Sequence, residues 1–353
     1  MLSVGQVRSG HQVVAMTTRE GSYPKHEFRD GYEVFRFDAI AKPWQNPITV
    51  EMLPRLLSYD IDSFDIIHGH SHLMFTTNLA ALKSRISHKP FIITNHGFSV
   101  QRGAFFDFAE DAYLSSLGRL TLASADYVIS FTNREREKTI AAGVSPERAI
   151  VIPNGVDTQL FRPESCESIP HSVIWTGRFV AEKGLTYLLE AANILKAEFQ
   201  DLKLIFVGYG EDLPKLLGLT RRLGLGDNVV FLEPKTQQEI VNLLNRCTLL
   251  ALPSLTEGFP STVLEAMSCQ KPVVVTSNIG LEEIVGDAGL YVPPGNSQAL
   301  AEKMKMILKS EELGVELGRQ GRERVVKYYD WSDVVVRSVN DLFENATAQK
   351  LKD

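Results

Sequence analysis

Short apolar strands alternate with longer helical segments through the whole second half of the chain. The strands are expected at 172–176, 203–207, 229–232, 249–253, 272–276 and 289–292, with helices at 185–198, 213–223 and 237–247. This alternation is typical of a parallel sheet that carries helices on both faces. In such open α/β sheets, ligands bind beyond the carboxyl ends of the strands, so the loops that follow the strands are the first places to look for function.

The first half of the chain follows the same pattern less regularly. Strands are expected at 11–18, 31–38, 65–68, 91–94, 125–130 and 149–153, and helices at 52–58, 76–84 and 104–123. With 353 residues the chain is longer than one core usually serves, which predicts two domains. Residues 162–171 contain two prolines and no apolar period, so we expect the linker there.

Residues 257–269, with the sequence EGFPSTVLEAMSC, carry the strongest functional pattern. The pattern predicts a tight loop that runs directly into a helix, with Pro260 in the first turn and Ser261 and Thr262 as capping residue types. Free amides at such a helix start favour an anion such as a phosphate. Glu257 and Glu265 can accept hydrogen bonds from sugar hydroxyls. The alternative is a surface loop with two solvated glutamates.

A second loop, at 177–184, follows the first strand of this half and has the sequence GRFVAEKG. Arg178 offers a planar set of donors and Lys183 a compact charge, so both suit a diphosphate. Together they can offset the negative charge of a bound anion without a metal ion, so no metal is expected here. By itself the loop could equally be a solvated basic turn.

These two loops resemble the signature of the retaining nucleotide-sugar glycosyltransferases of the GT-B fold, glycosyltransferase family 4 (glycosyl transferases group 1). The resemblance implies two doubly wound, Rossmann-like parallel-sheet domains that face each other across a cleft. It places an acceptor-side domain at 1–163, a nucleotide-sugar-binding domain at 164–331, and a last helix at 332–353 that crosses back to the first domain.

The resemblance also implies the function: transfer of a hexosyl group from a nucleoside-diphosphate sugar to a glycan, lipid or small-molecule acceptor, with retained configuration and no cofactor. Glu265 is expected to bind the ribose and Glu257 the transferred sugar, with His96 beside that sugar. Donor binding is expected from Arg178, Lys183, Gly258, Phe259, Pro260, Ser261, Thr262 and Glu265, and catalytic roles from His96 and Glu257.

The start of the chain departs from the family pattern, because the strand and glycine-rich loop that open the first domain are absent before residue 11. The first strand of a doubly wound sheet is usually central, so its absence predicts two strand edges without partners. Either the chain is shortened at its start or this half is structurally reduced.

Three histidines at alternate positions, His68, His70 and His72, invite a zinc interpretation, because alternation on a strand would place them on one face. No carboxylate or cysteine completes the set, so packing or hydrogen-bonding roles are favoured and no metal is expected.

Composition excludes several classes of function. The net charge is −6 and neither half is basic, which argues against nucleic acid as a partner. Three cysteines without metal or redox spacing fit a reducing cytosol, and no apolar run reaches membrane-spanning length. We expect a cytoplasmic protein, with peripheral contact at the inner membrane face left open. The alternatives are a sugar-nucleotide epimerase on the same architecture and a non-catalytic sugar-nucleotide-binding protein.

Overall fold

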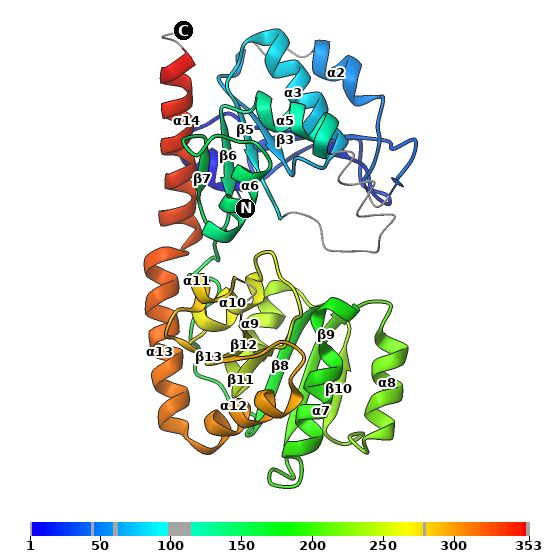
Figure 1. The fold of residues 1–353 in the computed structure, drawn as a ribbon, viewed down its shortest axis with the longest axis vertical. Coiled ribbons are helices and arrows are strands. Elements are labelled where there is room, and N and C mark those ends of the chain that lie inside the picture. The colour runs from blue at the N-terminus through cyan, green and yellow to red at the C-terminus, as the bar shows by residue number, and fades with distance from the viewer. Residues whose placement is uncertain (1, 44–45, 59–62, 98–113, 278–279, 351–353) are drawn as a thin grey trace. The chain divides into compact units, whose positions relative to one another are not determined.

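The computed structural model describes residues 2–43, 46–58, 63–97, 114–277 and 280–350, and the chain divides into two compact units. Unit 1 comprises Met1–Pro153 together with Val335–Asp353, and unit 2 comprises Asn154–Val334. Each unit is described by itself below, with the element labels of Figure 1.

Unit 2 contains a six-stranded sheet in the order β10-β9-β8-β11-β12-β13, in which every neighbouring pair is parallel. The strands are β8 (Ser172–Arg178), β9 (Lys203–Tyr209), β10 (Val229–Leu232), β11 (Leu249–Leu252), β12 (Val273–Thr276) and β13 (Gly289–Val292). This order is that of a doubly wound sheet. The first three strands are added toward one edge of the sheet, and the chain then returns to add the next three toward the other edge. The reversal falls between β8 and β11, so the loops after these two strands lie at the switch point where ligands bind.

Helices surround this sheet in Figure 1 and bury its strands. They are α7 (Leu185–Leu195), α8 (Leu213–Arg222), α9 (Gln237–Arg246), α10 (Ser261–Ser268), α11 (Glu282–Val285), α12 (Ser297–Lys309) and α13 (Glu311–Tyr328). Every residue of β11 and β12 is buried, as expected for parallel strands covered on both faces. Among the described helices of the whole chain, none combines the length and apolar character needed to cross a membrane.

Unit 1 contains two separate sheets. Four parallel strands form the order β4-β5-β6-β7, namely β4 (Ile67–His70), β5 (Phe91–Thr94), β6 (Tyr127–Ser130) and β7 (Ala149–Val151). A three-stranded sheet has the order β1-β3-β2, with β1 (Val14–Thr18) parallel and β2 (His26–Arg29) antiparallel to β3 (Tyr32–Phe37). Strand β2 is not predicted from the sequence, because its residues HEFR are mostly polar and exposed.

The helices of unit 1 are α1 (Leu2–Arg8), α2 (Met52–Ser58), α3 (Phe75–Ser87), α5 (Arg119–Ser124), α6 (Asn133–Ala141) and α14 (Arg337–Lys350). A π-helical turn, Leu114–Gly118, precedes α5. The helix expected at 104–123 thus corresponds in part to these two elements, and its portion up to residue 113 lies outside the described residues.

Two strand edges of unit 1 lack partners within the described residues, as expected from the sequence. Strand β1 pairs only with β3, and β4 pairs only with β5. The two sheets nevertheless share apolar packing, since Phe37 of β3 is buried in one cluster with Met16 of β1 and Ile67 of β4. This shared core holds the sheets together without a backbone ladder between them.

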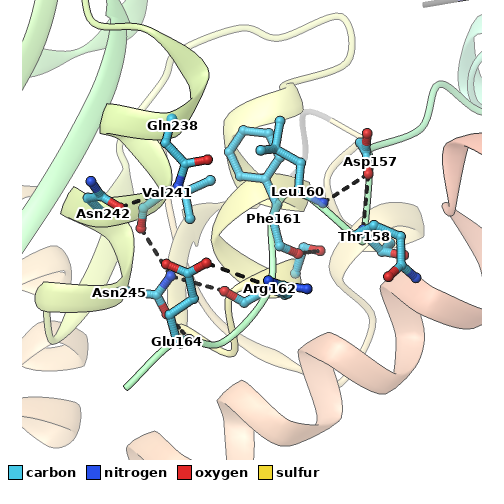
Figure 2. Close-up of polar contacts among 12 residues, drawn as sticks. Asp157, Thr158, Leu160, Phe161, Arg162, Glu164, Gln238, Val241, Asn242 and Asn245 are labelled. Carbon is cyan, nitrogen blue, oxygen red and sulfur yellow. Dashed lines mark hydrogen bonds and ion pairs between the residues drawn. The ribbon is translucent and has the colours of Figure 1, made fainter. Parts of the chain in front are cut away.

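The connection between the units differs from the prediction, because the division falls at Pro153 and not at residue 163. Val156 and Phe161 are buried in the main core of unit 2. The Asn245 side chain of α9 accepts a hydrogen bond from the Glu164 amide at 2.9 Å and donates to the Arg162 carbonyl at 3.0 Å (Figure 2). Polar composition alone suggests a free linker here, whereas these contacts make the segment part of unit 2.

The C-terminal helix α14 belongs to unit 1, because the chain returns to that unit at Val335. The Tyr127 hydroxyl donates to Gln349 Oε1 at 2.9 Å, and the Phe343 ring meets the His68 ring edge-on with centroids 5.4 Å apart. These contacts join the last helix to β6 and β4.

We predict that the open edges of unit 1 exchange amide hydrogens faster than the sheet of unit 2. Alternate amides of β1 and β4 face away from their single partner strands, whereas β8 is paired on both sides. Hydrogen exchange followed by mass spectrometry or NMR should show strong protection of β8, β9 and β11 and weak protection of β1 and β4. Equal protection of β4 and β8 would contradict this prediction.

Candidate functional site

The two loops at the switch point of unit 2 contact each other directly. The first follows β8 and includes the 3₁₀ turn Ala181–Lys183, and the second follows β11. The Leu255 amide donates to the Glu182 carbonyl at 2.8 Å and so joins their backbones. Because β8 and β11 are adjacent, residues 74 positions apart in sequence meet here.

Gly184 permits this close approach of the two loops. It has φ +64°, and a Cβ built at this position would lie 2.2 Å from the Pro253 carbonyl oxygen. Any other residue would therefore meet both a strained backbone conformation and a clash with rigid backbone. Gly184 also ends the 3₁₀ turn and places Lys183 directly before α7.

Lys183 and Glu257 form an ion pair across the two loops. Lys183 Nζ lies 2.7 Å from Glu257 Oε1, and the side chains expose 22% and 6% of their surfaces. The Ser254 hydroxyl donates to the same carboxylate oxygen at 2.7 Å. The structure thus brings together a cation and a carboxylate that the sequence pattern predicts as parts of one site, and it adds Ser254, which the pattern did not identify.

Helix α10 begins at Ser261, with Pro260 as the N-cap residue in extended conformation. The capping role expected of Ser261 and Thr262 is wrong, because no side chain caps this helix and both residues already belong to its first turn. The placement of Pro260 within the first turn is wrong for the same reason. The first amides of a helix have no intrahelical acceptor, so the expected anion-attracting helix start remains.

Glu265 lies one turn inside α10 and is largely surrounded by protein. Burial raises the pKa of its carboxyl group to about 7, and a hydrogen bond with the Ser261 side chain opposes that rise. Hydrogen-bond donors of a ligand would stabilise the charged form of this buried carboxyl group and lower its pKa again.

The remaining predicted donor residues occupy different environments. Arg178 ends β8 and is exposed, and its guanidinium group forms no hydrogen bond or ion pair with another described residue, so it is available to a ligand. Gly258 is exposed. Phe259 packs against the core of unit 2, with its ring 6.3 Å from that of Tyr329, so its side chain has a structural role.

Unit 1 contributes a cluster of histidines at the carboxyl ends of β4 and β5. Strand β4 extends to His70, two residues beyond the predicted end, which places the His68 and His70 rings 4.5 Å apart on one face. His70 Nδ1 lies 3.1 Å from His96 Nε2. His96 therefore lies beyond β5, as the pattern predicts, with a histidine partner that the pattern did not assign.

His72 does not join this cluster. Ser71, with φ +60°, turns the chain, and His72 Nδ1 instead lies 2.9 Å from Asn95 Oδ1 in a buried pair. Within the described residues, no three histidine, cysteine or acidic side chains are grouped so that they could hold a metal ion. The alternation of the three histidines thus does not produce a three-histidine face.

The clustered histidines favour the neutral form. Burial lowers the pKa of His70 to about 4, with repulsion from His96 as a further cause, and burial also lowers the pKa of His96. Both residues nevertheless expose part of their surface to solvent. A neutral imidazole can donate from one nitrogen and accept at the other, which suits hydrogen bonding to hydroxyl groups.

Comparison with known proteins agrees with this architecture. Residues 1–160 match the family model described as Glycosyltransferase Family 4, and residues 162–324 match Glycosyl transferases group 1. An uncharacterised glycosyltransferase of Methanocaldococcus jannaschii, MJ1607, is 25% identical over 96% of this chain and 91% of its own length.

Two solved structures share the fold. Sucrose-phosphate synthase from Thermosynechococcus elongatus has a TM-score of 0.80 at 22% identity, covering 99% of this chain and 92% of that one. HepE from Anabaena, in complex with UDP-glucose, has a TM-score of 0.74 at 22% identity, covering 91% and 87%. The fold and the two family matches identify a glycosyltransferase of the GT-B type. Within that class, the chain joins a family 4 domain to a group 1 domain.

We predict that Gly184→Ala lowers the free energy of unfolding of unit 2 by about 1–3 kcal/mol, because a Cβ forces the two loops apart. Thermal unfolding followed by tryptophan fluorescence, to which the buried Trp175 of unit 2 contributes, measures the loss. Gly226→Ala is the matched control, since a Cβ there meets nothing within 4 Å. Equal unfolding temperatures for both variants would contradict the packing argument.

We predict that unit 1 loses stability as the pH falls from about 6.5 toward 4. The pKa of His70 is lowered to about 4 in the folded state and is about 6.5 in an unfolded chain, so the unfolded chain binds the proton first. The contribution of neutral His70 to the free energy of unfolding is therefore complete above pH 6.5, and it is lost as the pH falls from 6.5 to about 4. Thermal unfolding by circular dichroism should show a weaker pH dependence for His70→Gln. Identical pH dependence in the two proteins would refute the assignment.

Proposed function

We propose that the protein transfers a hexosyl group from a nucleoside-diphosphate sugar to a glycan, lipid or small-molecule acceptor, with retention of configuration. The observation that carries this proposal is the ion pair between Lys183 and Glu257 at the switch point of the unit 2 sheet. It brings a cation suited to phosphate and an acceptor suited to sugar hydroxyls to one place, next to the helix that bears Glu265.

The diphosphate is proposed to lie against Lys183, Arg178 and the first amides of α10. Negative charge develops on the diphosphate as the glycosidic bond breaks, and groups already held in place stabilise that charge without reorganising. Lys183 has three ammonium donors and uses one toward Glu257, so donors remain for phosphate oxygens. On this proposal no metal ion is needed for departure of the diphosphate.

The two carboxylates are proposed to bind the two ends of the donor. Glu265 accepts hydrogen bonds from the ribose hydroxyls, which stabilise its charged form against the burial that raises its pKa. Glu257 accepts from a hydroxyl of the transferred sugar. His96 is proposed to hydrogen-bond a hydroxyl of that sugar through its neutral ring.

Retention of configuration is proposed from the family resemblance. We propose attack of the acceptor on the same face from which the diphosphate leaves, because neither glutamate is assigned a nucleophilic role. The developing positive charge on the sugar resembles that in glycoside hydrolysis.

The donor is proposed to be a UDP-sugar in the first instance, since HepE, which shares the fold, is described in complex with UDP-glucose. Thermal-shift screening with UDP-, GDP- and ADP-sugars tests this choice, because a bound ligand raises the unfolding temperature. A shift with a GDP- or ADP-sugar only would retain the function and change the donor.

We predict that Lys183→Ala and Glu265→Ala each weaken binding of the donor found in this screen at least tenfold, about 1.4 kcal/mol, as measured by calorimetry. Each removes a charged group proposed to touch the donor. Lys203→Ala is the matched control, because Lys203 lies at the opposite end of β9 and binds the Asp227 carbonyl. Unchanged affinity in both site variants would refute the assigned donor site.

Turnover distinguishes the proposed transfer from its alternatives. Release of nucleoside diphosphate only in the presence of an acceptor supports transfer, and NMR of the product then reports the anomeric configuration. Conversion of the donor without acceptor would indicate an epimerase. Donor binding without turnover under any acceptor would indicate a binding protein.

A further inference from the structure

We infer that Ser254 is a positioning residue that fixes the carboxylate of Glu257 for the sugar part of the donor. It thereby makes the site favour a nucleotide sugar over the bare nucleoside diphosphate. The inference rests on the proposed function, since it concerns the same site.

Ser254 is built into the rigid part of unit 2. It lies two residues beyond the end of β11 and has no exposed surface. Its hydroxyl donates to Glu257 Oε1 at 2.7 Å, and Lys183 Nζ lies 2.7 Å from the same oxygen. Two donors on one oxygen hold that oxygen in place and limit how the carboxylate can turn, and no described residue donates to Oε2.

The two donors differ in what a ligand does to them. Lys183 is on a flexible stem and is proposed to contact the diphosphate, so it shifts toward phosphate when a donor binds. Ser254 has a short side chain on buried backbone and faces no proposed phosphate contact. Ser254 is therefore the anchor that keeps Glu257 in place while Lys183 moves, which leaves Oε2 directed to one sugar hydroxyl.

Loss of the Ser254 hydroxyl should affect binding of the sugar and binding of the nucleotide differently. Without the Ser254 hydroxyl, Glu257 is held by Lys183 alone and follows the ammonium group toward the diphosphate. The contact with the sugar is then weakened, while the contacts of Lys183, Arg178 and Glu265 with the nucleotide remain.

The experiment compares binding of UDP-glucose and UDP by calorimetry in the full chain. For Ser254→Ala we expect affinity for UDP-glucose to fall about tenfold and affinity for UDP to change less than twofold. Ser254→Thr keeps the hydroxyl and should bind UDP-glucose within about threefold of the wild type. If the added methyl group prevents folding, Ser254→Cys, of nearly the same size, takes its place and should lie between wild type and Ser254→Ala.

Ser268→Ala is the matched control. Ser268 is also fully buried, but its hydroxyl contacts the Phe161 carbonyl and Arg322 and not Glu257. We expect this variant to lose stability without changing the ratio of the two affinities. An equal loss of UDP and UDP-glucose binding in Ser254→Ala, or no loss of either, would overturn the inference.

A crystal structure of unliganded Ser254→Ala gives a readout that does not depend on a donor. We expect the Glu257 carboxylate to rotate away from its present position and to remain bonded to Lys183. An unmoved carboxylate would overturn the positioning role even if the variant binds donor poorly. If wild type binds no nucleotide sugar, the proposed function fails, whereas this structure still decides whether Ser254 positions Glu257.

Discussion

The ion pair between Lys183 and Glu257 is the interaction on which the proposed site depends. The pair lies at 2.7 Å with little exposed surface, so water screens it less than it screens a surface pair. Lys183 and Glu257 lie on two loops that are joined by the hydrogen bond from the Leu255 amide to the Glu182 carbonyl. The loops can approach this closely because Gly184 has no side chain. The pair therefore needs no large rearrangement to present charge and acceptor to one ligand.

The two units differ in how their strands form sheets. Unit 2 has one continuous sheet whose strands β11 and β12 are wholly buried, and every predicted donor residue lies in it, at the end of β8, in the loops after β8 and β11, or in α10. Unit 1 has two sheets joined by apolar packing and the histidine cluster at the ends of β4 and β5.

Much of unit 2 follows from local sequence. Its strands and helices begin and end within a few residues of the predicted positions, because parallel strands buried on both faces form unbroken apolar runs between polar loops. Prediction fails where contacts distant in sequence decide the outcome. Strand β4 extends to His70 through pairing with β5, and residues around Phe161 join unit 2 through its core although their composition resembles a linker.

The sequence by itself determined the strand–helix alternation and the residue types at the two loops. These follow from period, composition and chain connectivity, which are local properties. Only the tertiary structure decided that Ser254 and Lys183 share one oxygen of Glu257, that His70 meets His96 while His72 turns away, and that Pro260 and not Ser261 precedes α10. The first two depend on strand order, which brings distant residues within hydrogen-bonding distance, and the third depends on the backbone conformation at Pro260.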